Sequence, residues 1–221
     1  YQGDGVRIVA TCGGDTVCFF DYRLGKPVAK YRRALATSEN ASSKEDFKCM
    51  RWTLLPARLD AGGEQTILAV AGVLGNVLLI QPKRAECYRC LEGHRGAVHA
   101  IEFHPQRQSW LFSASADGTI RWWEIGSVDA NTSDYGCMAI IGGQSSPIPT
   151  ALAFADDRML IGHGDGSVST FLLADPYKYA AHPTKRISYH SITLQCPAVH
   201  HGHVSALVAL QDGGFGKYAK R

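Results

Sequence analysis

Four short segments of the chain share one pattern of apolar and polar positions. In each, a run of alternating apolar residues enters a tight turn rich in Gly, Asp or Asn, and a second run leaves it. Alternation with period two on both sides of such a turn is typical of a β-hairpin. Helical periodicity is not evident anywhere in the sequence. We therefore predict an all-β chain with hairpins over 12–21, 71–80, 113–125 and 162–171.

The hairpins recur at a spacing that is itself informative. When the turns are superimposed, four positions fall in register: Thr16, Asn76, Thr119 and Ser167. Successive positions are 60, 43 and 48 residues apart, and the longest interval contains polar stretches near 35–46 and 58–65 that are expected to be surface loops. A unit of about 40–45 residues with four strands is typical of a β-propeller blade.

A further apolar run precedes each hairpin after the first and is expected to form the innermost strand of a blade. These runs are 47–55, 97–103 and 148–154, and a last one at 204–210 has no hairpin after it. We predict one partial propeller over 1–212, followed by an atypical tail at 213–221. Its blades are expected near 1–34, 46–93, 94–144 and 145–199, with the start of another at 200–212.

Composition narrows the classes of protein without naming one. The 221 residues are 45% hydrophobic and 19% charged, which are ordinary values for a globular domain. A net charge of +3 does not require a nucleic-acid or membrane partner, and a small basic cluster at Lys30, Arg32 and Arg33 is either a phosphate contact or a solvated face. The longest apolar stretch, 67–80, is too short for a membrane-spanning helix. Seven scattered cysteines favour a reducing compartment.

The third predicted blade resembles the WD-repeat unit. The resemblance rests on its opening, its turn and its close, which are Gly93-His94, Asp117-Gly118 and Trp123-Glu124. Glu124 stands where that unit usually has Asp, and the other blades match less well. The resemblance implies a WD-repeat β-propeller of seven blades, of which this chain, as an incomplete fragment, would hold about four.

Four polar or aromatic residues of this blade are the main candidate site. In WD blades these residue types form a structural hydrogen-bond network, which the resemblance places at His94, Ser113, Asp117 and Trp123. The alternative is a hydrolase triad, because Ser, His and Asp all occur within 24 residues. A Gly-x-Ser-x-Gly elbow is missing from the sequence, so the structural network is favoured and no catalytic residue is assigned.

A metal site is the second alternative that the sequence raises. Cys87 and Cys90 have zinc-like spacing, with His94 and His99 nearby. Zinc needs four converging ligands, whereas side chains on a strand alternate in direction, and a second Cys-x-x-Cys pair is missing. We therefore predict neither a metal nor a cofactor.

A closer resemblance covers residues 6 to about 125. The stretches that carry it are Val9 to Asp21, Lys30-Tyr31, Met50-Arg-Trp52 and Ile67 to Gly75. They resemble the propeller of the leucine-rich repeat and WD repeat-containing family that associates with the origin recognition complex. With Gly93-His94 and Phe103-His-Pro105, the same region is also similar to the embryonic ectoderm development subunit of the Polycomb methyltransferase.

The resemblance carries a set of functional expectations. It implies a non-enzymatic, nuclear scaffold on chromatin that binds origin recognition complex subunits and repressive trimethyl-lysine histone marks, supporting replication initiation and heterochromatin. Leucine-rich repeats are expected in the parent protein, and neither a membrane nor a small-molecule substrate is expected as a partner. The alternative is a Polycomb-like histone-tail reader in a lysine methyltransferase complex. Phe47 is the candidate partner-facing aromatic, with a core position as its alternative, and Lys48 aligns with an expected aromatic wall.

Overall fold

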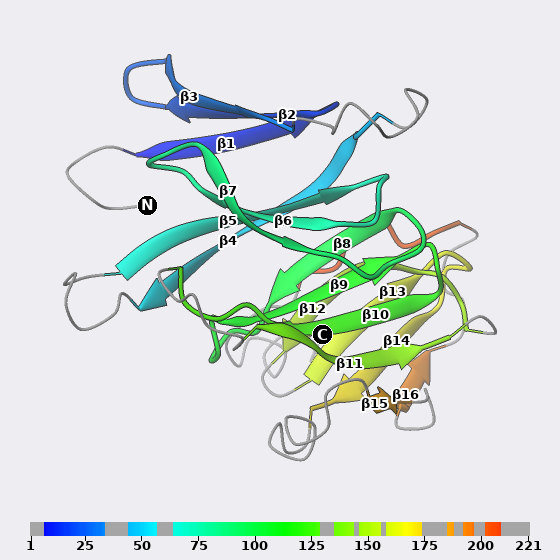
Figure 1. Cartoon of the computed structure of the whole chain (residues 1–221). Helices are drawn as coiled ribbons and strands as arrows, with labels where there is room; N and C mark the ends of the chain where they lie inside the picture. The colour runs from blue at the N-terminus through cyan, green and yellow to red at the C-terminus, as the bar shows by residue number, and fades with distance from the viewer. Residues whose placement is uncertain are drawn as a thin grey trace, which may run out of the picture.

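The computed structural model describes residues 7–33, 44–56, 64–128, 135–143, 146–155, 158–173, 185–187, 192–196 and 202–208. Within these residues the regular secondary structure is all β, arranged in four sheets that follow one another along the chain (Figure 1). The predicted all-β fold is therefore confirmed. No helix long and apolar enough to span a bilayer is found in the described part of the chain.

The first two sheets are antiparallel meanders. The first contains three strands: β1 (Ile8–Gly13), β2 (Thr16–Asp21) and β3 (Lys26–Arg32). The second contains four: β4 (Phe47–Pro56), β5 (Glu64–Gly72), β6 (Val77–Gln81) and β7 (Glu86–Leu91). The predicted hairpins over 12–21 and 71–80 correspond to β1–β2 and to the junction of β5 with β6.

The last two sheets repeat this order, with one addition. The third contains β8 (Val98–Phe103), β9 (Trp110–Ser115), β10 (Thr119–Glu124) and β11 (Gly136–Gly142). The fourth contains β12 (Pro149–Ala155), β13 (Arg158–His163), β14 (Val168–Leu172) and β16 (Ile192–Cys196). The short strand β15 (Lys185–Ile187), which the periodicity does not predict, joins the third sheet parallel to β11.

The sheets pack face to face, and this explains the longest apolar stretch of the sequence. The first strands of the sheets, β1, β4, β8 and β12, contact one another in that order, as the innermost strands of a propeller do. In the second sheet, every residue from Ile67 to Ala71 in β5 is fully buried. Because a strand covered on both faces has no position for a polar side chain, it is continuously apolar. The stretch 67–80 is thus a buried hairpin.

Each interface between sheets has its own hydrophobic core. The first joins β2 to the second sheet through Val17 and Phe19. The second joins β5 and β6 to the third sheet, where Leu111 and Trp123 are buried. The third joins Phe112, Trp122 and their neighbours to the fourth sheet.

The expected strand at 204–210 is not observed over its described part. Residues 202–208 contain no strand, and 209–210 lie outside the described residues. Val204 is nevertheless buried: its N–H donates to the His163 carbonyl at 3.0 Å, and its own carbonyl accepts a hydrogen bond from Thr150 Oγ1 at 2.7 Å. The described residues supply no neighbouring strand with which this segment could form a ladder.

We predict that Gly72→Ala destabilises the chain. A Cβ at Gly72 would lie 2.2 Å from the Asp46 carbonyl oxygen, a backbone atom that cannot move without disturbing the start of β4. Overpacking of this kind costs about 1–3 kcal/mol. Gly13→Ala is the control, because nothing lies within 4 Å of its added Cβ. Urea denaturation should show a lower free energy of unfolding for Gly72→Ala alone, and equal values for the two variants would contradict the packing argument.

Candidate functional site

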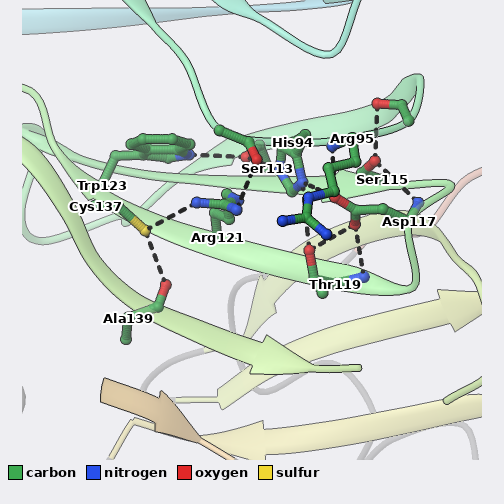
Figure 2. A network of polar contacts seen from close by, with 12 residues as sticks. His94, Arg95, Ser113, Ser115, Asp117, Thr119, Arg121, Trp123, Cys137 and Ala139 are labelled. Atoms are coloured by element: carbon green, nitrogen blue, oxygen red, sulfur yellow. Dashed lines mark hydrogen bonds and ion pairs between the residues drawn. The ribbon is translucent and has the colours of Figure 1, made fainter. Parts of the chain in front are cut away.

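The four residues predicted to form a network meet on the third sheet (Figure 2). His94 lies in the segment between β7 and β8, Ser113 lies in β9, and Trp123 lies in β10. Asp117 lies in the turn that joins β9 to β10. The site therefore connects the segment that enters the sheet to its two middle strands.

The hydrogen bonds of the site form a continuous chain. His94 Nε2 lies 2.7 Å from Ser113 Oγ, and His94 Nδ1 lies 3.0 Å from Asp117 Oδ2. Trp123 Nε1 donates to the same Ser113 Oγ at 2.8 Å. An indole can only donate and a carboxylate can only accept, so a neutral His94 that donates from Nδ1 and accepts from the Ser113 hydroxyl satisfies every group.

Asp117 also organises the turn around it. Its Oδ2 accepts the backbone N–H of Arg95 at 3.0 Å, and its Oδ1 accepts the backbone N–H and the hydroxyl of Thr119 at 3.0 and 2.6 Å. Partial burial alone would raise the pKa of Asp117, but the hydrogen bonds from His94, Thr119 and the Arg95 amide together outweigh burial and hold it well below its usual range. Asp117 is therefore a fixed anion that anchors the inter-sheet segment.

The geometry favours a structural role for these groups over nucleophilic catalysis. Ser113 is fully buried, His94 is 8% exposed, and the Ser113 oxygen is already occupied by the indole N–H of Trp123. A nucleophile must be reached by its substrate. The Ser, His and Asp side chains that could form a triad by residue type are therefore inaccessible to a substrate in the folded chain.

Glu124, which replaces the usual Asp, has a partner that its extra length allows it to reach. Its Oε2 accepts from Trp110 Nε1 at 2.8 Å, and its Oε1 accepts the N–H of Gly126 at 3.2 Å. Trp110 packs edge-on against Trp122, with ring centroids 4.6 Å apart. The carboxylate thereby fixes an aromatic pair at the interface with the fourth sheet.

The fourth sheet has a different version of the network. Asp165 Oδ1 accepts from the amide and hydroxyl of Ser167 at 3.0 and 2.6 Å, and His163 Nε2 lies 2.6 Å from Ser169 Oγ. Phe171 occupies the position of Trp123 and is fully buried. A phenyl ring needs no hydrogen-bond partner, so this blade does not need an equivalent of Ser113.

A buried ion pair, which the sequence did not predict, holds the segment that leads into β4 of the second sheet. Glu45 was expected within a surface loop, but it is 2% exposed and pairs with Arg33 at 2.5 Å. Its Oε1 also accepts the backbone N–H of Leu74 in the β5–β6 turn at 3.4 Å. Arg33 therefore does not belong to a purely solvated basic face. The available signal was the position of Glu45 two residues before an inner strand.

The structure places Phe47 in the core instead of on a partner-facing surface. Its side chain is 3% exposed and belongs to the interface between the first and second sheets, as the alternative interpretation expected. As the first residue of β4, it turns toward the packed interface. Lys48 beside it is exposed and forms an ion pair with Asp46, so it supplies a cation where an aromatic wall was expected.

The cysteine and histidine candidates for zinc do not converge. Cys87 and Cys90 lie in β7, and both nitrogens of His94 are engaged within the network. Burial raises the pKa of the Cys87 thiol, and that of Cys90 to about 11, which disfavours the thiolates that zinc requires. Among the described residues, no group of three or more His, Cys, Asp and Glu side chains could hold a metal ion.

The strand order, the Asp117 turn and the His–Ser–Asp–Trp network together define blades of a WD-repeat β-propeller. A sequence model of the WD domain of leucine-rich repeat and WD repeat-containing protein 1 matches residues 1–181. The chain belongs to this family, whose propellers are non-catalytic scaffolds.

Individual relatives agree with this assignment. The chain is 33% identical over 127 residues to leucine-rich repeat and WD repeat-containing protein 1 of Xenopus laevis, covering 57% of this chain and 16% of that protein. It is 29% identical over 167 residues to the Homo sapiens protein of the same name, covering 73% and 24%. The chain thus spans at most about a quarter of these relatives.

More distant similarity extends to Polycomb proteins. Polycomb protein esc of Drosophila melanogaster is 25% identical over 201 residues, covering 89% of this chain and 44% of that protein. Among solved structures, an active polycomb repressive complex 2 in the basal state contains a chain that matches with a TM-score of 0.70 and 20% identity, covering 94% of this chain and 43% of that one. At that identity the structural match supports the fold alone.

We predict that Ser113→Ala costs stability. Removing the hydroxyl leaves Trp123 Nε1 and His94 Nε2 buried without their shared partner, at a cost of about 1–3 kcal/mol. Ser109→Ala, a half-buried serine next to β9 and outside this network, is the control. The free energy of unfolding from urea titration is the measurement. An unchanged value for Ser113→Ala would show that the network does not contribute to stability.

Asp117 should also make stability depend on pH. Its pKa is lowered in the folded chain, so its ionised form stabilises the fold above the unfolded value of about 3.9, and this contribution is lost as the pH falls through the folded value. Asp117→Asn should be less stable near neutral pH and should lose less stability between about pH 5 and 2. Unfolding free energies across that range test this, with exposed Glu92→Gln as control. Parallel curves for wild type and Asp117→Asn would refute it.

Proposed function

We propose that this chain is part of a nuclear, chromatin-bound scaffold that binds origin recognition complex subunits and nucleosomes bearing repressive trimethyl-lysine marks. In this role it would support replication initiation and heterochromatin. The observation that carries the proposal is the family match over residues 1–181. The buried networks support it, because rigid blades hold loops and inner strands in fixed positions for recognition.

The inner strand β4 offers a surface suited to such recognition. Trp52 is 37% exposed, and its ring lies 6.2 Å from that of Phe19. One residue away, Arg51 is half-exposed and pairs with Glu102 of β8 at 2.9 Å. An exposed aromatic ring can attract a methylated ammonium group. We therefore assign Trp52, in place of Phe47, as the aromatic residue on β4 that a histone tail would contact.

A second candidate function is a histone-tail reader within a lysine methyltransferase complex. The similarity to Polycomb protein esc over 89% of this chain favours it. The two functions differ in their protein partners: origin recognition complex subunits for the first, and a methyltransferase catalytic subunit for the second.

The test uses the full-length protein that contains this chain. We expect it to bind reconstituted origin recognition complex, and to prefer nucleosomes with a repressive trimethyl-lysine mark by about tenfold, or ~1.4 kcal/mol, over unmodified ones. Trp52→Ala should reduce that preference by more than its loss of packing against Phe19 lowers the folded fraction, which thermal unfolding measured in parallel reports. Val73→Ala, which removes an apolar side chain of similar exposure (38%) from the β5–β6 turn, should leave it intact.

Two outcomes decide between the candidate functions. Binding to a Polycomb methyltransferase catalytic subunit, without binding to the origin recognition complex, would replace the first proposal with the second. Binding to neither, with no preference among nucleosomes, would overturn both.

A further inference from the structure

The first sheet differs from the other three on the inner side of β1. Its strand order is β1-β2-β3, so that edge of β1 has no paired strand in the part of the chain that the structure describes. The hairpin register makes β1 equivalent to β5, because Cys12 lies opposite Val17 as Ala71 lies opposite Val77. Strand β5 pairs on its inner side with β4, and its equivalents β9 and β13 pair with β8 and β12. The inner edge of β1 is thus an open position for one more strand.

The segment 204–208 has the complementary property: it has the sequence pattern of an inner strand but no sheet. Its sequence, Val-Ser-Ala-Leu-Val, follows the starts of β8 (Val-His-Ala-Ile-Glu) and β12 (Pro-Thr-Ala-Leu-Ala), with a polar residue second, alanine third and an aliphatic residue fourth. Residues 202–208 contain no strand. Ser205 and Ala206 are exposed, and Val208 is 85% exposed.

Val204 is placed as the first residue of an inner strand would be. Its N–H donates to the His163 carbonyl at the end of β13, at 3.0 Å. The N–H of Phe47, which begins β4, donates in the same way to the Gly14 carbonyl in the β1–β2 turn of the preceding sheet, at 2.8 Å. Figure 1 shows the first and fourth sheets at opposite ends of the arrangement. The segment therefore stands where a sheet after the fourth would begin, away from β1 of its own copy.

The aromatic residues of the inner strands indicate the same gap beside β1. Phe103 in β8 and Phe154 in β12 are 9% and 7% exposed, and each packs toward a preceding sheet that has an inner strand. Trp52 has the equivalent position in β4, packs on Phe19 of the first sheet and is 37% exposed. A strand added beside β1 would cover more of this ring. It would therefore compete with the peptide contact proposed for Trp52.

We propose that residues 204–208 of one copy add to the inner edge of β1 in a second copy, as the inner strand of its first sheet. The completed sheet packs between the fourth sheet of one copy and the second sheet of the other. Because each copy can both donate a strand and accept one, two copies close head to tail into a ring of eight sheets, within the usual range of about 4–8 propeller blades. This inference does not rest on the function proposed above.

The other sheets give the register of this pairing. In each of them, a small residue of the inner strand lies opposite a small residue of the next strand: Cys49 with Ala71, Ala100 with Ala114, and Ala151 with Gly162. The same register sets Ala206 opposite Cys12 of the partner subunit. The position before it falls at a register shift in all three sheets, and the large side chains of Lys48 and His99 are exposed there. Position 206 should therefore require a small residue, and position 205 should not.

The test compares Ala206→Phe with its matched control Ser205→Phe in the 221-residue chain. Both positions are exposed, so neither variant should lower the thermal stability of a single copy. Sedimentation across about 1–100 μM measures the mass of the assembly. Wild type and Ser205→Phe should approach twice 24.0 kDa as the concentration rises. Ala206→Phe should need at least about tenfold higher concentration, because a phenyl ring overpacks the contact with Cys12.

Disulfide trapping locates the contact. Residues directly opposite in a strand pair lie on the same face of the sheet, within reach of each other. Under mild oxidation, Ala206→Cys should therefore form a disulfide with Cys12 that joins two copies. The disulfide should be absent when Cys12→Ser is added to the same variant. Hydrogen exchange of wild type gives a measurement without substitutions: protection of residues 8–13 should rise with concentration, and that of the buried strand β6 should not.

Three results would overturn the proposal. The first is a wild-type mass that stays at one copy across the whole range of concentration. The second is equal association of Ala206→Phe and wild type, because pairing at Ala206 would then not hold the copies together. The third is a disulfide between positions 206 and 12 within one copy, because the chain would then close on itself.

Discussion

Burial of both faces of each sheet against its neighbours is the constraint on which the rest of this structure depends. No single sheet supplies a core of its own, and the three hydrophobic clusters each lie between two successive sheets. This packing also removes water from polar groups at the strand ends. These groups then need hydrogen-bond partners within the protein. The networks at those ends therefore follow from the packing and are not independent features.

Different blades solve the same problem with different chemistry. The third sheet uses His94 and Asp117 to hold the segment that enters it, and the second uses the Arg33–Glu45 ion pair at the corresponding place. In the fourth, Asp165 accepts hydrogen bonds from the amide and the hydroxyl of Ser167 in the turn, and Phe171 is buried where the third sheet has Trp123. A repeat can lose its characteristic residues in this way and keep its shape. Each position needs only a polar group that has a hydrogen-bond partner, or an aromatic ring that carries no polar group.

The sequence predicted local features well and long-range ones poorly. The hairpins follow from alternation and turn residues, and the resemblance to a WD blade located the four residues that meet around Ser113. Two features depend on pairing between distant segments, and local periodicity carries no signal for them: the burial of Glu45 and the addition of β15 to β11. The core position of Phe47, in contrast, was the alternative that its place at the start of an apolar run already offered.

The close approach of Val204 to Gly162 limits the order in which the chain can fold during synthesis. A Cβ at Gly162 would lie 2.5 Å from Val204, so the end of β13 is shaped to receive a residue that follows about 40 positions later. At ribosomal rates of about 5–20 residues per second, that residue emerges roughly 2–8 s after the strand it covers. During this interval the Gly162 end of β13 lacks the Val204 side chain that covers it in the folded chain, so this end of the fourth sheet is completed last.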